Sequence, residues 1–342
     1  MAFPLLKLPV LAYEEVLLNF EVADLIDFSL LSSRCHRIIR STRFPLTGID
    51  VCIGSFNSDC LRFSNGTPHP IAIWRFMKEP WRKVSDTENG WRRIGRTRIR
   101  IQKEPTWVST RKPIKNIKVA FDYARDLFRL PVVRFSLSHT EQNVFPQQYG
   151  ITKCDEVYMW VFHKIPVDEL KYILEKMEIS KKLTLYLKEN NDFECGFVQF
   201  SMDDLVIKRA FWITKETFLA MDCARITLQG NKDLPIKEFV SQWLSSRNTR
   251  FEWLKMYECR RWNRENINWN DEFKPMKWNP AIRGRNFKIS DFQRVDCEKG
   301  IDFLREDGML ATVVKGRQGL IYFIVWHKRF QPEADNLQLD SW

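Results

Sequence analysis

The segment Leu8–Ser41, LPVLAYEEVLLNFEVADLIDFSLLSSRCHRIIRS, carries more information about the fold than any other part of the chain. Of its 34 residues, 19 are hydrophobic, against 44% of the whole 342-residue chain. Below about 40 residues, a segment rarely buries enough apolar surface to fold by itself. We therefore expect this segment to share its apolar surface with the rest of the chain or with a partner protein.

The hydrophobic residues of this segment recur at helical spacing. Tyr13, Val16, Leu17 and Phe20 follow the i, i+3, i+4, i+7 pattern of one helix face. Two further groups continue it: Val22, Leu25 and Ile26, then Leu31, Cys35, Ile38 and Ile39. The pattern predicts three short helices, with Pro9 restricting the backbone of the lead-in.

The middle of the chain is basic and rich in tryptophan. The window Trp74–Lys118 holds 14 Lys/Arg and 4 Asp/Glu, a balance of +10 out of a net charge of +11 for the chain. Alternating residues in IDVCIGSF and TRIRIQ predict strands. GTPHP, at 66–70, and Asn89–Gly90 predict turns.

From Pro113 onwards, helical and strand patterns alternate. An amphipathic helix with Ile117, Phe121, Ala124 and Phe128 on one face precedes the strand VVRFSLS. The order strand, helix, strand then occurs twice, once from Cys154 and once from Cys223, 69 residues later. Between the two copies, CGFVQF predicts another strand and AFWITKETFLAMDC predicts a short helix. The turn ITLQGNKDL is similar to a leucine-rich-repeat turn, so we expect an irregular array of helix–strand repeats.

The C-terminal part of the chain, up to Trp326, has the pattern of a three-stranded β-meander. Asp307–Gly308 is a hairpin signal, and GRQG marks a second turn. The strand LIYFIVW is apolar at nearly every position, so we expect both of its faces to be buried. The expected class is therefore α+β: three helices, then a mixed α/β domain of helix–strand repeats that ends in a β-meander.

The sequence contains no recognisable catalytic or metal-binding motif. Its five histidines are isolated, and its eight cysteines are scattered singly without the spacing of a zinc site. We therefore expect no cofactor and no enzymatic activity, and reduced cysteines that serve as small buried residues in the cytoplasm, the nucleus or both. The longest dense apolar run, Ile321–Trp326, is too short to span a bilayer.

The basic stretch leaves three interpretations open. It could be a solvated basic strand whose tryptophans lie in a core, a patch that attracts acidic proteins, or a surface that binds nucleic acid through phosphates and base stacking. Its densest part, WRRIGRTRIRIQK, contains the candidate basic patch Arg92, Arg93, Arg96, Arg98 and Arg100.

The segment Leu8–Ser41 resembles an F-box. The matching steps are the Leu8–Pro9 pair, an apolar helix with Val16 and Leu17, the acidic-Leu step at Asp24–Leu25, and a serine-rich helix with basic residues. Cys35 stands where the family usually has tryptophan. The blocks ITKCDEVYMW, KKLTLYLK, ITLQGNKDL and REDGMLATVV similarly resemble the nematode type 2 F-box-associated domain.

These resemblances imply both domain boundaries and partners. The F-box would occupy residues 3–44, a basic connecting region 45–112, the associated domain 113–330 and a polar tail 331–342. An F-box binds a Skp-type adaptor, which docks on a cullin–RING scaffold, so the chain would be the non-catalytic substrate-recognition subunit of an SCF-type ubiquitin ligase with an unknown protein substrate. The positions that the family would use for the adaptor are Leu8, Pro9, Leu11, Val16, Leu17, Leu25, Ile26 and Leu31.

Overall fold

The computed structural model describes residues 7–54, 59–67, 69–78, 90–95, 97–102, 107–110, 113–138, 144–188, 190–231, 234–258, 269–316 and 319–327. Short N-terminal helices are followed by a mixed β-sheet with helices, which confirms the α+β class. The chain divides into two compact units, Met1–Ile179 and Ser180–Trp342. This division coincides with none of the boundaries predicted at 44, 112 and 330.

All three helices predicted for Leu8–Ser41 form in the first unit. They are α1 (Val10–Leu18), α2 (Val22–Ser29) and α3 (Ser33–Ser41). Pro9 lies just before α1, and its carbonyl accepts the first helical hydrogen bond, from the Tyr13 amide. Ser32 caps α3, since its side chain accepts a hydrogen bond from the Cys35 amide and so satisfies a free helix N–H group.

The described residues of the first unit include eight strands, β1 to β8, that form one mixed array. Their order is β8-β7-β1-β2-β3-β6-β5-β4, in which β1, β7 and β8 are parallel while β1, β2 and β3 are antiparallel. The predicted turn at 66–70 joins β2 to β3, and Gly66 adopts the left-handed φ of +88° that glycine permits. The bounds are β1 Gly48–Ile53, β2 Asp59–Ser64, β3 Ala72–Lys78, β4 Gly90–Ile94, β5 Thr97–Gln102, β6 Trp107–Thr110, β7 Val132–Ser138 and β8 Lys153–Val161.

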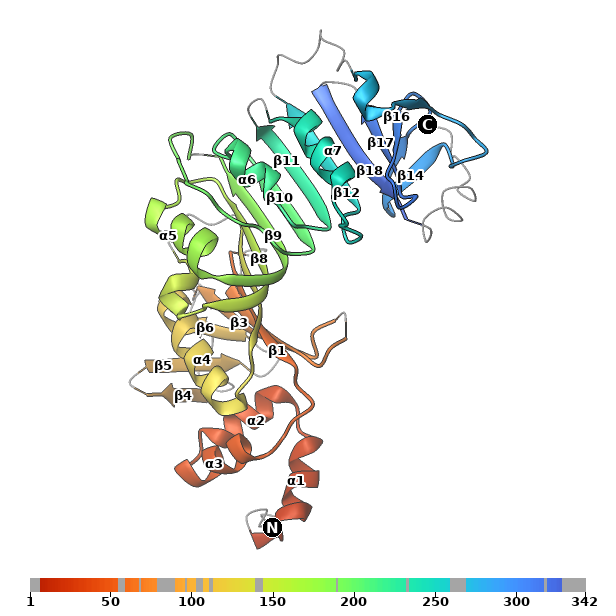
Figure 1. Cartoon of the computed structure of the whole chain (residues 1–342). Helices are drawn as coiled ribbons and strands as arrows, with labels where there is room; N and C mark the ends of the chain where they lie inside the picture. Colours follow the sequence, from red (N-terminus) through yellow and green to blue (C-terminus); the bar gives the residue numbers. More distant parts are fainter. Residues whose placement is uncertain are drawn as a thin grey trace. The chain divides into compact units, whose positions relative to one another are not determined.

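The long helix α4 (Pro113–Phe128) covers one face of this array (Figure 1). Its side chains Ile117, Phe121 and Ala124 are fully buried, as the predicted apolar face requires. Phe128 is half-buried and meets the ring of Phe63, on β2, edge to face. The unit is completed by a 3-10 turn (Pro146–Tyr149), by α5 (Val167–Lys171) and by one π-helical turn (Tyr172–Lys176).

The second unit begins with four parallel strands. They are β9 (Glu178–Leu187), β10 (Asp204–Lys208), β11 (Arg225–Asn231) and β12 (Trp253–Glu258), paired in that order. Helix α6 (Lys215–Leu219) connects β10 to β11, and α7 (Ile236–Ser245) connects β11 to β12. Parallel neighbours need such crossovers because the chain must return to the same end of the sheet before the next strand starts.

One predicted strand is wrong. CGFVQF, at 195–200, has no strand partner, and the next strand of the ladder is instead β10. Val198 and Phe200 are nevertheless buried. The amide of Val198 donates to the Thr217 hydroxyl and the carbonyl of Phe200 accepts from the Asp222 amide. Alternating burial therefore indicated an extended segment correctly, but its backbone hydrogen bonds do not join it to a sheet.

The second unit ends in the predicted meander. Strands β16 (Ile301–Leu304), β17 (Leu310–Lys315) and β18 (Leu320–Trp326) pair antiparallel in sequence order, and β18 continues the ladder on β12. Gly308, in the predicted turn, has a φ of +87°. A 3-10 turn (Asp271–Phe273) and the short β13 (Met276–Lys277), which pairs with β16, precede this meander.

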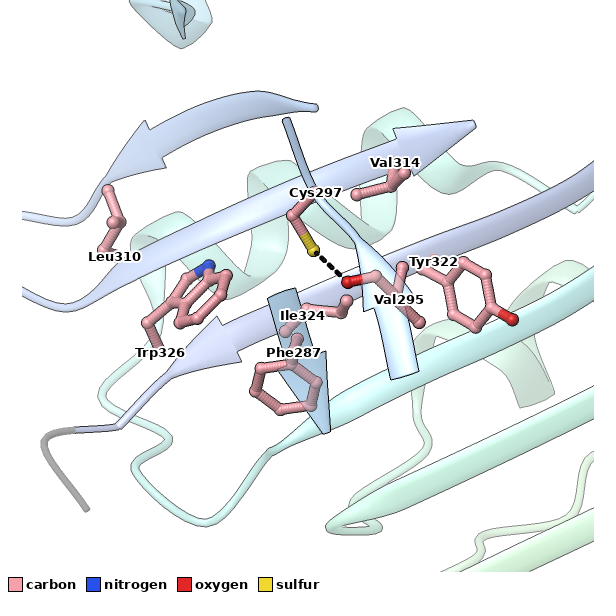
Figure 2. Close-up of a cluster of buried hydrophobic side chains, with 8 residues drawn as sticks. All are labelled: Phe287, Val295, Cys297, Leu310, Val314, Tyr322, Ile324 and Trp326. Atoms are coloured by element: carbon pink, nitrogen blue, oxygen red, sulfur yellow. Dashed lines mark hydrogen bonds between the residues drawn. The ribbon is translucent and has the colours of Figure 1, made fainter. Parts of the chain in front are cut away.

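Strand β18 is buried on both faces, as its continuous apolar run predicted. On one face, Phe323 packs against the rings of Phe239, Trp243 and Phe251. On the other, the hairpin of β14 (Asn286–Ser290) and β15 (Gln293–Asp296) covers a cluster that Figure 2 shows. The members of this cluster are Phe287, Val295, Cys297, Leu310, Val314, Tyr322, Ile324 and Trp326.

Candidate functional site

The three N-terminal helices form a small bundle with its own interior. Six of their apolar side chains are buried: Leu17, Val22, Leu25, Ile26, Cys35 and Ile39. Cys35 is 4% exposed, and its Sγ accepts a hydrogen bond of 3.1 Å from the Ser32 hydroxyl. A cysteine thus fills a buried position at the start of α3, where the F-box resemblance leads one to expect tryptophan.

Helices α2 and α3 attach this bundle to α4. The hydroxyls of Ser29 and Tyr123 lie 2.7 Å apart, and the ring of His36 packs on that of Tyr123. Arg40 forms an ion pair of 3.0 Å with Asp126, at the half-exposed edge of this contact. Burial raises the pKa of Tyr123, against the opposing effect of the Ser29 hydrogen bond, so the phenol stays neutral at physiological pH.

Large apolar side chains remain exposed on the bundle. Among the described residues, 12 large hydrophobic side chains are exposed, and five of them lie in this segment. They are Val10 (56%), Leu11 (77%), Leu18 (41%), Phe20 (37%) and Leu31 (70%). Single exposed apolar residues are ordinary on a protein surface, so the feature that distinguishes the bundle is their number within one short segment. We call these five side chains the apolar surface of the bundle.

One of the five side chains, Phe20, also lines a groove beside α2. The groove has a volume of about 460 Å³ and lies between α2 and β3. Phe20, Val22 and Ile26 line one side, and Ile71 and Trp74 line the other. Its walls are therefore largely apolar, and the exposed ring of Phe20 belongs to both features.

The eight positions predicted for the adaptor occupy different depths of the bundle. Pro9, Leu11 and Leu31 are exposed, and Leu8 and Val16 are half-buried. Leu17, Leu25 and Ile26, in contrast, are at most 3% exposed and hold the helices together. A contact between any of these eight residues and an adaptor stays a prediction. For Leu17, Leu25 and Ile26, a direct contact would require the bundle to open.

Three members of the apolar surface were missed in the sequence. Val10, Leu18 and Phe20 were not among the predicted contacts, although all are exposed. For Val10 and Leu18, a signal was present, because both lie outside the periodic series that forms the inner face of α1. An apolar residue out of phase with its helix face is a candidate for an intermolecular contact.

Of the five residues of the predicted basic patch, only Arg93 has a side chain that the structure describes. Arg96 is not described, and of Arg92, Arg98 and Arg100 only the backbone is, in β4 and β5. Arg93 is exposed, and its Nε donates to the Gly95 carbonyl at 2.9 Å. The β4–β5 register pairs Arg93 with Arg98, but Arg92 with Ile99. Because neighbouring positions of a strand belong to opposite faces, Arg92 and Arg93 are not on one face of this hairpin.

The described residues form neither a metal cluster nor a membrane-spanning helix. No group of three or more His, Cys, Asp or Glu within them is arranged to hold a metal ion. No helix in the same part of the chain is long and apolar enough to cross a bilayer.

Comparison with known proteins shows distant relatives along nearly the full chain. The chain is 25% identical to the uncharacterized protein F59B2.8 of Caenorhabditis elegans, over 98% of its own length and 80% of that protein's. It is 23% identical to the uncharacterized protein F59B2.9 of the same organism (99% and 82%), and 24% identical to F54H12.5 (95% and 93%). No family model and no solved structure matches the chain. These alignments thus cover the sequence of the helical bundle and of both units.

Proposed function

We propose that this chain is the substrate-recognition subunit of an SCF-type cullin–RING ubiquitin ligase. The N-terminal bundle would be an F-box that binds a Skp-type adaptor, and the remaining α/β part, with its leucine-rich-repeat-like units and its meander, would be an F-box-associated domain that binds a protein substrate. The chain would act in the cytoplasm, the nucleus or both. The observation that carries the proposal is the apolar surface of the bundle.

The physical case begins with the cost of exposing apolar side chains. Burial of apolar surface stabilises by about 25 cal/mol per Å², or about 1.5–3 kcal/mol for a leucine that becomes fully buried. Leu11 and Leu31 are 77% and 70% exposed, so most of that free energy is still available to a partner. The bundle is also attached to α4 by Ser29, His36 and Arg40. A partner bound to the apolar surface would therefore be held at a defined position relative to the first unit.

In this proposal the chain performs no chemistry. A receptor that binds both the ligase scaffold and a substrate raises the effective concentration of the substrate near the ubiquitin-charged enzyme. This role requires two binding surfaces and no catalytic residue. The nucleic-acid alternative rests on the basic window, where Arg93 is the one member of the predicted patch whose side chain is described, so it stays a prediction from the sequence.

The deciding experiment measures binding of the full-length chain to a recombinant Skp-type adaptor by isothermal titration calorimetry. Leu11→Asp and Leu31→Asp change exposed side chains of the bundle, while Phe292→Asp changes a fully exposed ring of the second unit and serves as the matched control. Each bundle variant is expected to weaken binding at least tenfold, since loss of a buried leucine contact costs more than the roughly 1.4 kcal/mol that a tenfold change represents. Phe292→Asp is expected to bind as the wild type does.

Exposed positions are the right ones to change, because a buried substitution would confuse binding with folding. Leu17→Asp would place a charge in the interior of the bundle and unfold it. Absence of binding by the wild-type chain, or equal binding by all three exposed variants, would refute the proposal. Affinity purification from nematode cells with the proteasome blocked would then identify the substrate.

A further inference from the structure

One face of the first unit's sheet carries a polar row that the proposed function does not use. Phe63 and Phe135 point towards the side of the array on which α4 and Tyr149 lie. Since side chains alternate along a strand, the positions between these residues belong to the opposite face. On that face the register aligns Glu156, Arg134, Asp50 and Arg62 across four strands, and Arg134 donates to Glu156 at 2.8 Å.

The next row on the same face contains two cysteines. Cys52 on β1 lies directly opposite Cys60 on β2 in the antiparallel register, and Arg75 on β3 lies opposite Cys60. Directly opposed residues of an antiparallel pair have Cα atoms about 4.5–5.5 Å apart. A disulfide spans Cα separations of about 4.4–6.8 Å, so this pair can be bridged without moving the backbone. Both thiols are free, with exposures of 2% and 3%.

The surroundings make the two thiols unequal. A hydrogen bond from Cys52 lowers the pKa of Cys60 to about 7, burial opposes this effect, and Arg62 and Arg75 assist it. The pKa of Cys52 is raised, chiefly by the same hydrogen bond and by burial. Cys60 is therefore the more acidic thiol of the pair and the one that ionises first, while Cys52 keeps its proton. The Nε of Arg62 is buried and has no hydrogen-bond partner among the described residues, so it is available to a negatively charged neighbour.

We propose that Cys52 and Cys60 are a peroxide-sensitive pair that forms a reversible disulfide between β1 and β2. The Cys60 thiolate attacks one oxygen of hydrogen peroxide, an S–O bond forms and the O–O bond breaks, and the released hydroxide takes a proton to become water. The Cys52 sulfur then attacks the Cys60 sulfenic acid, the S–S bond forms, and the expelled hydroxide leaves as water with the proton of Cys52. Two thiols lose two electrons and one peroxide becomes two water molecules.

The other described cysteines provide internal controls. Cys154 and Cys297 are also buried and free, but burial raises the pKa of each to about 12. No cysteine stands opposite either residue in the registers of these strands: Cys297 directly follows β15, and the pairing of β8 with β7 begins at Glu156, beyond Cys154. Thiolate character, exposure to the oxidant and a resolving partner all favour this chemistry. The Cys52–Cys60 pair has the first and the third, and because its thiols are only 2% and 3% exposed, peroxide must reach them through local opening of the sheet. The proposal therefore predicts selective oxidation of one pair in a chain that holds eight cysteines.

The test treats the full-length chain with hydrogen peroxide, blocks free thiols with N-ethylmaleimide and analyses a non-reduced digest by mass spectrometry. We expect a peptide pair linked through Cys52 and Cys60 that dithiothreitol separates, with Cys154 and Cys297 alkylated. The rate is expected to rise with pH and to level off above about 7, where Cys60 is ionised. Oxidation of the control cysteines at the same rate, no linked pair, or a rate that still rises tenfold per pH unit above 8 would overturn the proposal.

Two variants assign the roles. In Cys52→Ala the resolving thiol is absent, so a sulfenic acid is expected to persist at Cys60 and to react with dimedone. In Cys60→Ala neither a disulfide nor dimedone labelling at Cys52 is expected. Circular dichroism unfolding shows whether each variant is folded, and the wild-type measurement decides the proposal even where a variant is not. Dimedone labelling of Cys60→Ala at Cys52 would refute the assigned roles.

Discussion

A buried ion pair of the second unit allows a quantitative test of its packing. The guanidinium of Arg283 and the carboxylate of Asp302 are 0% and 3% exposed and lie 2.8 Å apart. Arg283 also donates to the carbonyls of Gly284 and Cys297, and the Thr312 hydroxyl donates to Asp302 at 2.7 Å. Replacement of Asp302 by alanine leaves the cation buried without its counter-ion and leaves Thr312 without this acceptor.

The loss of stability expected from Asp302→Ala is large for a single substitution. Removal of one partner of a buried ion pair costs about 3–5 kcal/mol, because the other charge stays desolvated and unpaired. The opening free energy of the strands that surround the pair would fall by the same amount. Their amide hydrogens would then exchange more than about a hundredfold faster, at roughly 1.4 kcal/mol for each factor of ten.

The same unit supplies a matched control at the surface. Arg285 and Asp296 form an ion pair of the same residue types, also at 2.8 Å, but 46% and 52% exposed. Because water screens this pair and solvates whichever partner remains, Asp296→Ala is expected to change exchange far less than Asp302→Ala. Hydrogen–deuterium exchange mass spectrometry of peptides from 301–315 in the full-length chain measures both variants. Equal exchange rates in Asp302→Ala and Asp296→Ala would refute the view that burial makes the Arg283–Asp302 pair important for stability.

Three further predictions, two of them with a control substitution, test the bundle and the first sheet. Leu17→Ala is expected to lower the free energy of unfolding by about 2–5 kcal/mol in urea titrations, whereas Leu11→Ala should change it by less than about 0.5 kcal/mol, because only Leu17 is buried. Ser32→Ala should cost about 1 kcal/mol through loss of the α3 cap, which the same titrations would detect, with Ser32→Asp retaining the cap. Gly48→Ala should reduce the yield of folded protein in gel filtration, since a Cβ at Gly48 would overlap the side chain of Val133; a wild-type yield would contradict this close approach.

The local elements of this fold were largely predictable. The helical series around Leu17 and the alternation in VVRFSLS correspond to α1 and β7, because the periods of 3.6 and 2 residues are properties of the backbone and are written into neighbouring residues. The burial of β18 on both faces followed from its unbroken apolar run. CGFVQF is the exception. Its alternation predicted the buried residues correctly, but alternation alone does not show whether a segment pairs with a neighbouring strand, and this one does not.

Helical periodicity separates two leucines of α1, but not the contacts of the bundle with the rest of the chain. Leu17 belongs to the predicted inner series with Tyr13 and Val16 and is 0% exposed, whereas Leu11 lies outside that series and is 77% exposed. The packing of α3 on α4, about 80 residues further along the chain, and the Ser29–Tyr123 hydrogen bond are contained in no local pattern. The resemblance to an F-box could name both leucines as candidate contacts but could not separate the exposed one from the buried one.

The sequence by itself determined the class, the order of the elements and the apolar excess of Leu8–Ser41, since these follow from composition and short-range periodicity. Only the tertiary structure decided which strands are neighbours. Cys52 and Cys60 appeared as two of eight scattered cysteines, and Arg283 and Asp302 as two charges among 97. Strand register places the first pair opposite each other, and closure of the second unit's core buries the other pair. Cys52 and Cys60 are only eight residues apart and Arg283 and Asp302 only 19, yet the sequence alone does not give the register or the packing that brings each pair together, because a slip of one residue in register moves a side chain to the other face of a sheet.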